Sequence, residues 1–491
     1  ELLPAGGGGS TVDFVASGTL PNGKPVILNS NGTVSAVAQA VISGSIPKAT
    51  EVVANSAATD SIAIAFNPNV ANSFVMVYRD HGNSFHGIAI VGTVSGTSIS
   101  FGSEFIFNSG NTADIDIDFD PSTSGKFVVV YRDIAGSGWG RGSVGTVSGT
   151  SISFGSEVAF DAPSPYSIKV AFNPNIAGSF IIAWRESHNS HYGSCVQGTV
   201  SGTSVSFGTT VQFRSSRADP YSIFFDPNTA GKFLILYRDE STATGRVIVG
   251  TISGVSFSFG TATQFISTDI AYAKLAFDPS TPNKFVVAYG DNNNNDYGKA
   301  VVGTISGTSL SFGTPVLFSS SGTQFIGLKF DPNFAGRCVI TFTDQGNSNY
   351  GKAVVGTVSG TSLSFSSIST FNSASAVYTT LSFDPNTKGN FVIIYTDAGN
   401  SDYGTAILST TDVNATNLTS TNFVGTSTKA YTNGQTATIA IRGGLSTNQT
   451  GLTIGSTYFV QPAGTLATTA GTPSVNAGKA LSATTLLLKD L

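Results

Sequence analysis

Charged residues, cysteine and long apolar runs are all scarce in this chain of 491 residues. Only 11% of the residues are charged and the formal net charge is −5, so the composition gives no reason to expect nucleic acid as a partner. No apolar run approaches the roughly 18 residues that a membrane-spanning helix needs. The two cysteines, Cys195 and Cys338, lie far apart in separate repeats, which argues against a disulfide between them. We therefore expect a neutral, polar surface and no insertion into a membrane.

A phrase of three residues, Phe-Asn-Pro or Phe-Asp-Pro, returns seven times along the chain. Its prolines are Pro68, Pro121, Pro174, Pro227, Pro279, Pro332 and Pro385. They stand 53, 53, 53, 52, 53 and 53 residues apart. A period held this strictly indicates one supersecondary unit that has been copied and stacked.

Each copy contains four short runs in which apolar and polar residues alternate, as strands require. In the second copy these runs are residues 115–119, 127–131, 142–147 and 151–154. An Asp-Pro turn with a later glycine joins the first two, and Ser-Gly-Thr joins the last two, so both connections are predicted to be tight hairpins. The sequence therefore predicts an all-β fold, a seven-bladed β-propeller of four-stranded repeats. The main rival is an open solenoid of β units.

The repeat divides the chain into three predicted parts. Residues 1–45 are expected to be a glycine-rich linker, up to about residue 12, followed by a small β-hairpin element. Residues 46–423 form the predicted propeller, and residues 424–491 a separate small β domain. Residues 45–53 align with the fourth strand of later copies, so we expect this N-terminal strand to complete the last blade and remove two open sheet edges.

One face of the predicted propeller varies between copies, whereas the other is nearly constant. The loops between second and third strands differ in sequence, and we call the face that carries them the variable face. If the copies arose by duplication, this is where specificity could lie, although the loops could also simply be unconstrained. The candidate ligand-binding residues on it are Arg79, Arg132, Trp139, Tyr166, Arg185, Tyr192, Tyr221, Arg238, Tyr272, Phe325 and Tyr378.

These candidates belong to three groups, each of which has a second interpretation. Five are aromatic residues at the start of first strands, where rings could hold the faces of sugars or could simply pack against neighbours. Four are arginines at the ends of second strands, which could grip a carboxylate or phosphate but could equally pair with acids of their own or the next blade. Trp139 and Tyr192 come from the loops between second and third strands.

First strands also carry charges that are expected to lie near the propeller axis. Three acids stand on the second copy and three lysines on other copies, namely Asp114, Asp116, Asp118, Lys169, Lys274 and Lys329. Mutual charge compensation is the favoured interpretation, and an ion site is the alternative. All four histidines fall in loops of the first and third copies, which are not neighbours, so we expect no metal site.

Signals of catalysis are weak. The chain has no glycine-rich phosphate loop and no nucleophile elbow, and we predict no catalytic residues and no cofactor. A glycoside hydrolase needs two carboxylates, and Asp80, Asp133, Glu186, Asp239 and Asp291 are available. These acids recur in register at turns, which favours loop capping over an acid and nucleophile with separate roles.

Residues 343–348 and 350–365, with their Thr-Asp-Gln-Gly-Asn-Ser and Tyr-Gly-Lys-Ala-Val-Val-Gly-Thr-Val-Ser-Gly-Thr-Ser phrases, resemble the propeller repeats of fibre and appendage proteins of marine tailed phages. Residues 451–466 and 475–484 resemble the C-terminal β module of the same proteins. The similarity covers most of the chain. It implies a non-enzymatic protein of the virion surface that binds a host surface glycan, and it transfers no catalytic residues.

We therefore expect a fibre or adhesin component at the virion surface or outside the cell. Its expected partners are a host surface polysaccharide or receptor and other virion or fibre subunits, in a homo-oligomeric assembly. The first alternative is a purely structural filament or virion subunit that assembles through its terminal segments. The second alternative is a glycan hydrolase.

Overall fold

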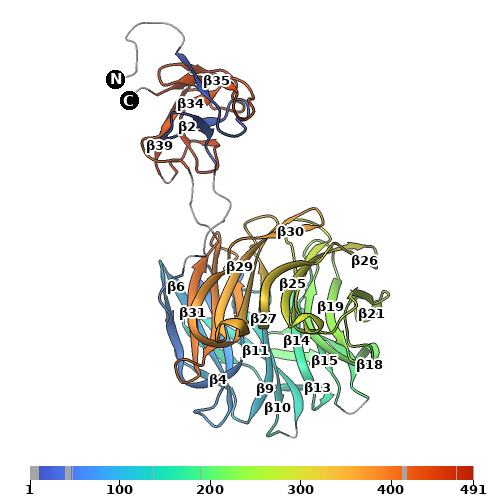
Figure 1. Ribbon diagram of the computed structural model, residues 1–491. Helices are drawn as coiled ribbons and strands as arrows, with labels where there is room; N and C mark the ends of the chain where they lie inside the picture. Colours follow the sequence, from blue (N-terminus) through green and yellow to red (C-terminus); the bar gives the residue numbers. More distant parts are fainter. Residues whose placement is uncertain are drawn as a thin grey trace. The chain divides into compact units, whose positions relative to one another are not determined.

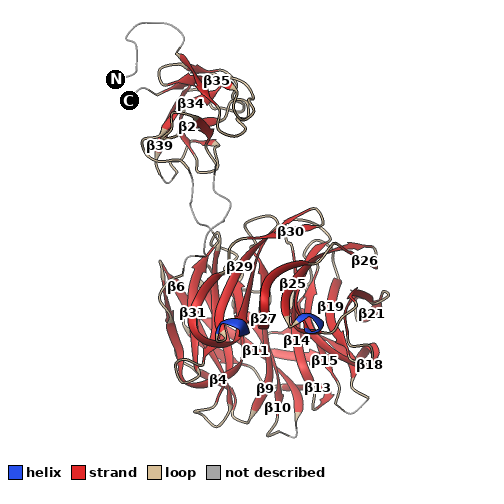
Figure 2. Cartoon of the chain, in the orientation of Figure 1, coloured by secondary structure: helices blue, strands red, loops and turns tan. Residues whose placement is uncertain are grey.

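The computed structural model describes residues 10–38, 46, 48–136, 138–187, 190–411, 417–471 and 473–489. Its strands form several antiparallel sheets, and the described residues include no α-helix. Two single 3-10 turns, η1 (Asn292–Asn294) and η2 (Gln345–Asn347), are the blue segments of Figure 2. The chain divides into a repeat unit, residues 44–412, and a terminal unit made of residues 1–43 and 413–491 (Figure 1).

The first strand of each repeat ends at the phenylalanine of the Phe-Asx-Pro phrase. These strands are β4 (Val52–Phe66), β9 (Thr112–Phe119), β14 (Tyr166–Phe172), β18 (Val211–Phe225), β23 (Ile270–Phe277), β27 (Val316–Phe330) and β31 (Ser369–Phe383). In every copy the Asx side chain accepts a hydrogen bond from the backbone N–H two residues later, at 2.9–3.1 Å. The turn is therefore closed locally, which explains why the phrase marks each repeat.

Second and third strands follow as antiparallel partners. The second strands are β5 (Ser73–Asp80), β10 (Lys126–Asp133), β15 (Ser179–Arg185), β19 (Lys232–Asp239), β24 (Lys284–Asp291), β28 (Arg337–Asp344) and β32 (Asn390–Asp397). The third strands are β6 (His86–Ser95), β11 (Trp139–Ser148), β16 (Tyr192–Ser201), β20 (Thr244–Ser253), β25 (Tyr297–Ser306), β29 (Tyr350–Ser359) and β33 (Tyr403–Thr410). After the third strand a two-residue turn begins with a glycine such as Gly149, whose φ of 61° suits a type II′ hairpin.

The fourth position of the sheet is built from two segments, where one strand was predicted. A short strand pairs with the later half of the third strand: β7 (Ser98–Phe101), β12 (Ser151–Phe154), β17 (Ser204–Phe207), β21 (Ser256–Phe259), β26 (Ser309–Phe312) and β30 (Ser362–Phe365). A second segment pairs with its earlier half. It is separate in β8 (Phe105–Asn108), β13 (Val158–Pro163) and β22 (Thr263–Ile266). Elsewhere it is the first half of β4, β18, β27 or β31, so an unbroken strand replaces the expected loop into the next repeat.

The first and seventh repeats are neighbours. Val52 and Val53 of β4 pair with Ala406 and Thr405 of β33, and Lys48 forms a bridge to Ser409. The expected N-terminal strand over residues 45–53 therefore does supply the outer position of the last sheet, although residues 45 and 47 lie outside the described residues. First strands of consecutive repeats contact one another in turn, and β31 contacts β4.

The apolar core of the repeat unit lies between consecutive sheets. One cluster joins Val75 and Val77 of the first repeat to Ile117 and Val129 of the second, and another joins Ile64 of the first repeat to residues of the seventh. Phenylalanine rings fill the space over third-strand glycines, because a Cβ on Gly145 would lie 2.1 Å from Cζ of Phe127 across the strand pair. Ring and glycine are therefore complementary, which accounts for the repeated Gly-Thr pair.

The terminal unit joins the two ends of the chain, which we had predicted to be separate elements. β1 (Thr11–Val15) pairs with β35 (Thr436–Ile441), and β2 (Pro25–Leu28) pairs with β34 (Phe423–Ser427). β3 (Val34–Ala36) completes this sheet. The predicted boundary at 45 lies within two residues of the division at 43, but the boundary at 423 is wrong, because residues 417–423 contribute Leu418 to the terminal core instead of a strand to the seventh repeat. Residues 1–9 of the predicted linker lie outside the described residues, and residues 11 and 12 already belong to β1.

A second sheet completes the terminal unit. It consists of β36 (Leu445–Ser446), β37 (Thr457–Val460), β38 (Leu466–Ala467), β39 (Val475–Ala480) and β40 (Leu486–Leu488). One apolar cluster contains Ile27 and Phe423 from the first sheet and Val460 and Leu486 from the second. Each sheet therefore buries its apolar side against the other, and neither half of this unit has a complete core without the opposite end of the chain.

Candidate ligand-binding face and central cavity

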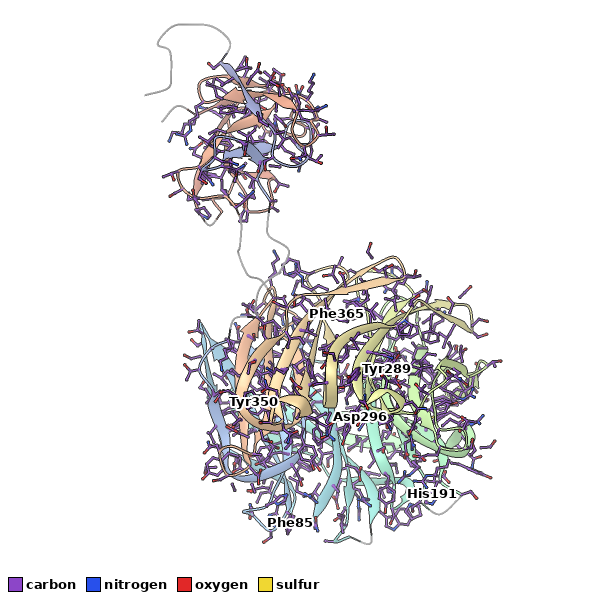
Figure 3. The ribbon with its side chains drawn as sticks, in the orientation of Figure 1. Phe85, His191, Tyr289, Asp296, Tyr350 and Phe365 are labelled. Carbon is purple, nitrogen blue, oxygen red and sulfur yellow. The ribbon has the colours of Figure 1, made fainter. Side chains whose placement is uncertain are left out.

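The loops between second and third strands lie together at one edge of the repeat unit. Figure 3 shows Phe85 and His191 of two such loops at this edge, whereas Phe365 at the end of β30 lies towards the opposite edge. The first strands begin at the same edge as these loops, since each runs towards the Phe-Asx-Pro turn. The variable face therefore exists as predicted, and its residues can be followed from the rim inwards.

Each of the four predicted arginines pairs with an acid. Arg79 donates from Nε to Asp60 Oδ1 at 2.6 Å, and Arg132 Nη2 lies 3.1 Å from Asp114 Oδ2, both within one repeat. Arg185 instead pairs with Asp219 of the next repeat. Of the two interpretations, the pairing with acids of the same or the next repeat is confirmed. The guanidinium groups act as bridges within the rim, and each already has an anionic partner.

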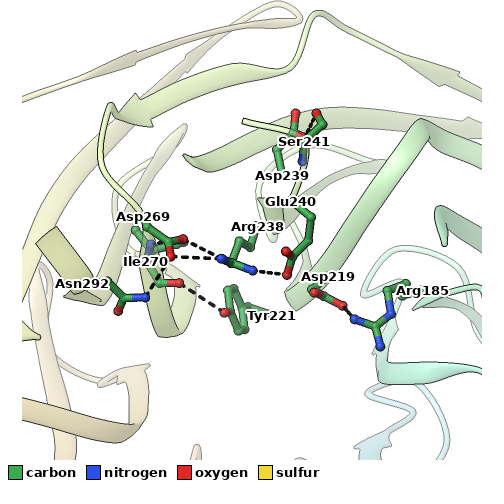
Figure 4. Close-up of polar contacts among 10 residues, drawn as sticks. All are labelled: Arg185, Asp219, Tyr221, Arg238, Asp239, Glu240, Ser241, Asp269, Ile270 and Asn292. Atoms are coloured by element: carbon green, nitrogen blue, oxygen red, sulfur yellow. Dashed lines mark hydrogen bonds and ion pairs between the residues drawn. The ribbon is translucent and has the colours of Figure 1, made fainter. Parts of the chain in front are cut away.

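The fourth arginine belongs to a network over three repeats, drawn in Figure 4. Arg238 donates to Asp269 from Nε at 2.6 Å and from Nη2 at 3.0 Å, and it also pairs with Glu240. These hydrogen bonds hold the pKa of Asp269 below its usual value. Burial, together with a hydrogen bond to Glu240, raises the pKa of Asp219 to about 6. The carboxyl groups of Asp219 and Glu240 therefore interact with each other, while Arg185 pairs with the first and Arg238 with the second.

Tyr166 is held by arginines and does not join the other aromatic candidates. The Cζ atoms of Arg132 and Arg185 lie 4.3 and 4.8 Å from its ring centroid. Cation–π contact at these distances stabilises the packing of the second and third repeats against each other. The sequence placed Tyr166 at the start of a first strand, like the other aromatic candidates, and there it pairs with Arg185 in the ladder before the bulge begins.

Tyr272, Phe325 and Tyr378 form an arc on the neighbouring strands β23, β27 and β31. Their ring centroids are 5.0 and 4.7 Å apart. Each lies in a β-bulge with positive φ, at 50°, 47° and 54°. Tyr378 is 40% exposed. Burial raises the pKa of both tyrosines, so their hydroxyl groups remain donors at neutral pH.

Tyr221 occupies a different register position on its strand from the residues of the arc. It is the unpaired residue between Pro220 and Ser222, one position after the bulge residue of the other repeats. Proline cannot adopt the positive φ found there, so the bulge moves by one residue. The Tyr221 hydroxyl lies 3.4 Å from the carbonyl oxygen of Ile270. The five aromatic residues expected at the starts of first strands therefore occupy three different register positions.

A cavity of about 350 Å³ lies among the first strands, and we call it the central cavity. Its aromatic lining is Tyr221, Phe224, Tyr272, Phe325 and Tyr378, and its charged lining is Asp114, Asp116, Asp118, Lys169, Lys274 and Lys329. The volume is within the range of ligand pockets, roughly 300–1,000 Å³. Phe224 was not predicted. The available signal was its register, because it aligns with Asp118 and Lys329 along the repeat.

The aspartates of β9 bind the backbone of the next first strand. Asp114, Asp116 and Asp118 accept hydrogen bonds from N–H groups of β14 at 3.0, 3.0 and 2.8 Å. Among the described residues no ion pair within 4.0 Å joins these acids to Lys169 or to the other two lysines. The expected charge compensation thus acts at a distance, while backbone donors take the carboxylate oxygens.

Trp139 and Tyr192 are the first residues of β11 and β16, and neither belongs to the described residues that line the central cavity. Tyr297, Tyr350 and Tyr403 begin β25, β29 and β33 in the same register, and the sequence reasoning missed them. In the third, fifth, sixth and seventh repeats the two residues before this tyrosine both have positive φ. The loops therefore share a backbone form, for which Asn, Asp and Ser are suited, although their sequences vary.

Five of the seven acids at the ends of second strands close turns. Asp80, Asp133, Asp239, Asp344 and Asp397 each accept a hydrogen bond from a backbone N–H two or three residues later. This role agrees with the loop capping that the sequence indicated for Asp80, Asp133 and Asp239. Glu186 instead accepts a hydrogen bond from Ser194 Oγ, and Asp291 accepts one from Thr268 Oγ1 at 2.8 Å, so among the described residues the expected capping is not found at these two acids. The described ranges contain no cluster of three or more potential metal ligands, and His188 lies outside them. No helix in the described part is long and apolar enough to cross a membrane.

No protein-family model matches the sequence, and no curated protein matches it. Solved structures do match the fold. One is the BP39L lectin from Burkholderia pseudomallei, with a TM-score of 0.51 and 10% sequence identity, over 73% of this chain and 97% of the lectin. Another is Sqt1 from Saccharomyces cerevisiae, with a TM-score of 0.46 and 10% identity, over 74% and 99% of the two chains. At 10% identity, the likeness to the lectin concerns the fold alone.

Proposed function

We propose that the repeat unit is a seven-bladed β-propeller that binds a glycan without catalysis, through the central cavity and the aromatic arc at its mouth. Seven first strands in sequential contact, with β31 against β4, support the propeller. The observation that carries the binding function is the arc itself. Rings of Tyr272, Phe325 and Tyr378 border a cavity of ligand size, and tyrosine combines an apolar face with a hydroxyl, as sugar rings require.

Backbone strain supports a role for the arc beyond packing. At the same bulge the first three repeats carry Ser61, Asp114 and Ser167, small or polar residues with φ of 50–54°. Bulky residues at positive φ are disfavoured, by roughly 1–3 kcal/mol each. Aromatic residues at this position of three successive repeats are therefore not explained by backbone preference. Their side chains supply something that serine or aspartate does not.

The similar structure from Burkholderia pseudomallei is a lectin, which agrees with sugar binding by a non-enzymatic protein. The engagement of Asp80, Asp133 and Asp239 in turns also favours binding over hydrolysis. On the resemblance to fibre proteins of marine tailed phages, we propose that the glycan is a host surface polysaccharide. We further propose that the chain acts at a virion surface or outside cells, as a homo-oligomer with other fibre subunits.

The test is a glycan array probed with the full chain, followed by calorimetry on the best ligand. Replacing Tyr272 or Tyr378 with alanine should weaken binding at least about tenfold, the equivalent of about 1.4 kcal/mol, through lost ring contact. Tyr350→Ala is the matched control, because Tyr350 is partly exposed and lies outside the cavity lining. An array without hits, or an equal loss in all three variants, would refute glycan binding by this cavity.

A further inference from the structure

The three lysines of the central cavity have ammonium groups with donors to spare. Lys169 Nζ donates to the carbonyl oxygen of Ile168 at 2.9 Å, which uses one of its three hydrogens. Lys329 Nζ lies 4.5 Å from the ring centroid of Phe224. Within the described ranges Lys274 has neither a hydrogen bond nor an ion pair. The cavity therefore presents cationic donors that no protein carboxylate contacts.

The carboxylates that could have neutralised these lysines are directed to the backbone instead. Asp118 accepts from Phe119 N–H at 3.0 Å with one oxygen and from Phe172 N–H at 2.8 Å with the other. Asp116 accepts from Val170 N–H, and Asp114 faces both a backbone donor and Arg132. These acids fasten β9 to β14. Their oxygens are occupied on that side, so these acids attract Lys274 and Lys329 only at a distance and leave the ammonium hydrogens free for a ligand.

The lysines also act on one another. Burial and the like charges of Lys169 and Lys329 lower the pKa of Lys274 to about 8. Burial likewise lowers the pKa of Lys329, against the attraction of Asp118 and Asp116. Like charges held together away from solvent are unfavourable unless a counter-ion joins them. A negatively charged ligand group would relieve this repulsion and accept the free hydrogen bonds.

We propose that the central cavity selects an anionic sugar residue, its carboxylate or sulfate held by Lys169, Lys274 and Lys329 and its ring held by the arc of Tyr272, Phe325 and Tyr378. This inference rests on the proposed glycan binding and names the class of sugar. The aromatic arc and the three lysines line the same cavity. The arc recognises the face of any pyranose ring, and the lysines distinguish charged from neutral sugars.

Calorimetry with three oligosaccharides of equal length tests the proposal on the full chain: an oligouronate, its carboxyl-reduced neutral counterpart, and a sulfated oligosaccharide. We expect the wild type to bind at least one anionic form about tenfold or more tightly than the neutral one, since charge-assisted hydrogen bonds are stronger than neutral ones. The preference should shrink as salt is raised. Tighter binding of the oligouronate would identify a carboxylate as the ligand group, and tighter binding of the sulfated oligosaccharide would identify a sulfate.

In the variants Lys274→Met and Lys329→Met, the ratio of the affinity for the anionic oligosaccharide to that for the neutral one should fall close to one, while the neutral form still binds. Lys284→Met is the matched control, because Lys284 begins β24 in the repeat of Lys274 but donates to Thr304, outside the cavity. The salt series on wild-type protein needs no variant, so it decides the matter even if a lysine variant fails to fold.

Each outcome separates the two claims. Equal binding of neutral and anionic forms, or a preference unchanged in Lys274→Met, overturns the anionic ligand and leaves glycan binding intact. Binding of none of the three oligosaccharides and of no array glycan overturns both. Equal binding of polyaspartate shows general attraction of polyanions and overturns the sugar class.

Discussion

Replacing Asp118 with asparagine should raise the free energy of unfolding by about 2 kcal/mol near neutral pH and lower it by about 1 kcal/mol near pH 4. Burial raises the pKa of Asp118 from its ordinary value of 3.8 to about 6, despite the hydrogen bond from Phe172 and the attraction of Lys329. Between these two values the folded carboxyl is protonated while the unfolded one is ionised. The folded state then binds more protons, so the free energy of unfolding of the wild type falls as pH rises through this window.

The size of the effect follows from the two pKa values. A difference of about two pKa units corresponds to about 3 kcal/mol, which is the destabilisation that wild-type protein carries above pH 6. Asparagine has no charge to lose. It keeps one oxygen for Phe172 N–H but gives up the second acceptor that Phe119 uses, at about 1 kcal/mol independent of pH. The stability difference between variant and wild type should therefore grow by about 3 kcal/mol from pH 4 to pH 7.

Guanidinium unfolding followed by tryptophan fluorescence gives the measurement. Trp139 and Trp184 are the two tryptophans of the chain, and both lie in the repeat unit, so the signal reports this unit alone. Asp402→Asn is the control, since Asp402 is exposed and removal of its charge should give a difference that is flat with pH. If the Asp118→Asn difference is equally flat, or falls with pH, the account of the buried carboxyl is wrong.

Three further outcomes follow from packing, pairing and domain structure. Gly145→Ala should lower the free energy of unfolding of the repeat unit by about 1–3 kcal/mol, because the added Cβ would overlap the ring of Phe127. The midpoint of guanidinium unfolding measures this loss, and a second change, Phe127→Leu, should restore the stability if the overlap is the cause. Arg238→Met should let the pKa of Asp269 rise towards its usual value and should lower the free energy of unfolding at pH 7 by about 1–3 kcal/mol. Titration of the Asp269 carboxyl group by NMR measures the first effect, and an unchanged pKa would contradict the pairing. A chain of residues 44–412 should fold with the fluorescence transition of the full protein, whereas loss of that transition would show that the terminal unit is needed.

Local chemistry explains how much of the fold the sequence predicted. The Phe-Asx-Pro phrase specifies a strand end and a turn whose Asx side chain bonds its own backbone, as Asp120 does with Ser122. The Ser-Gly-Thr phrase specifies a II′ hairpin in the same way. Neither depends on distant residues, so three strands of each repeat and their order could be predicted. The two-part fourth position could not, because pairing with the third strand selects it.

The candidate site was predicted less well, because register and charge pairing are non-local. From the sequence, Tyr166, Tyr221 and Tyr272 could be grouped only as aromatic residues at the starts of first strands. The structure separates them, because the first pairs before the bulge and the proline at 220 moves the bulge in the fourth repeat. Which acid each arginine meets depends on the adjacent sheet, as the pairing of Arg185 with Asp219 shows.

The sequence by itself determined three strands of each repeat, their turns and the seven-fold repetition, because these depend on side chains that act on their own backbone within a few residues. Only the tertiary structure decided that residues from both ends of the chain form one unit. It also decided that the arc and the lysines meet in one cavity. These features depend on sheet edges and apolar faces that become complementary only when segments hundreds of residues apart are brought together.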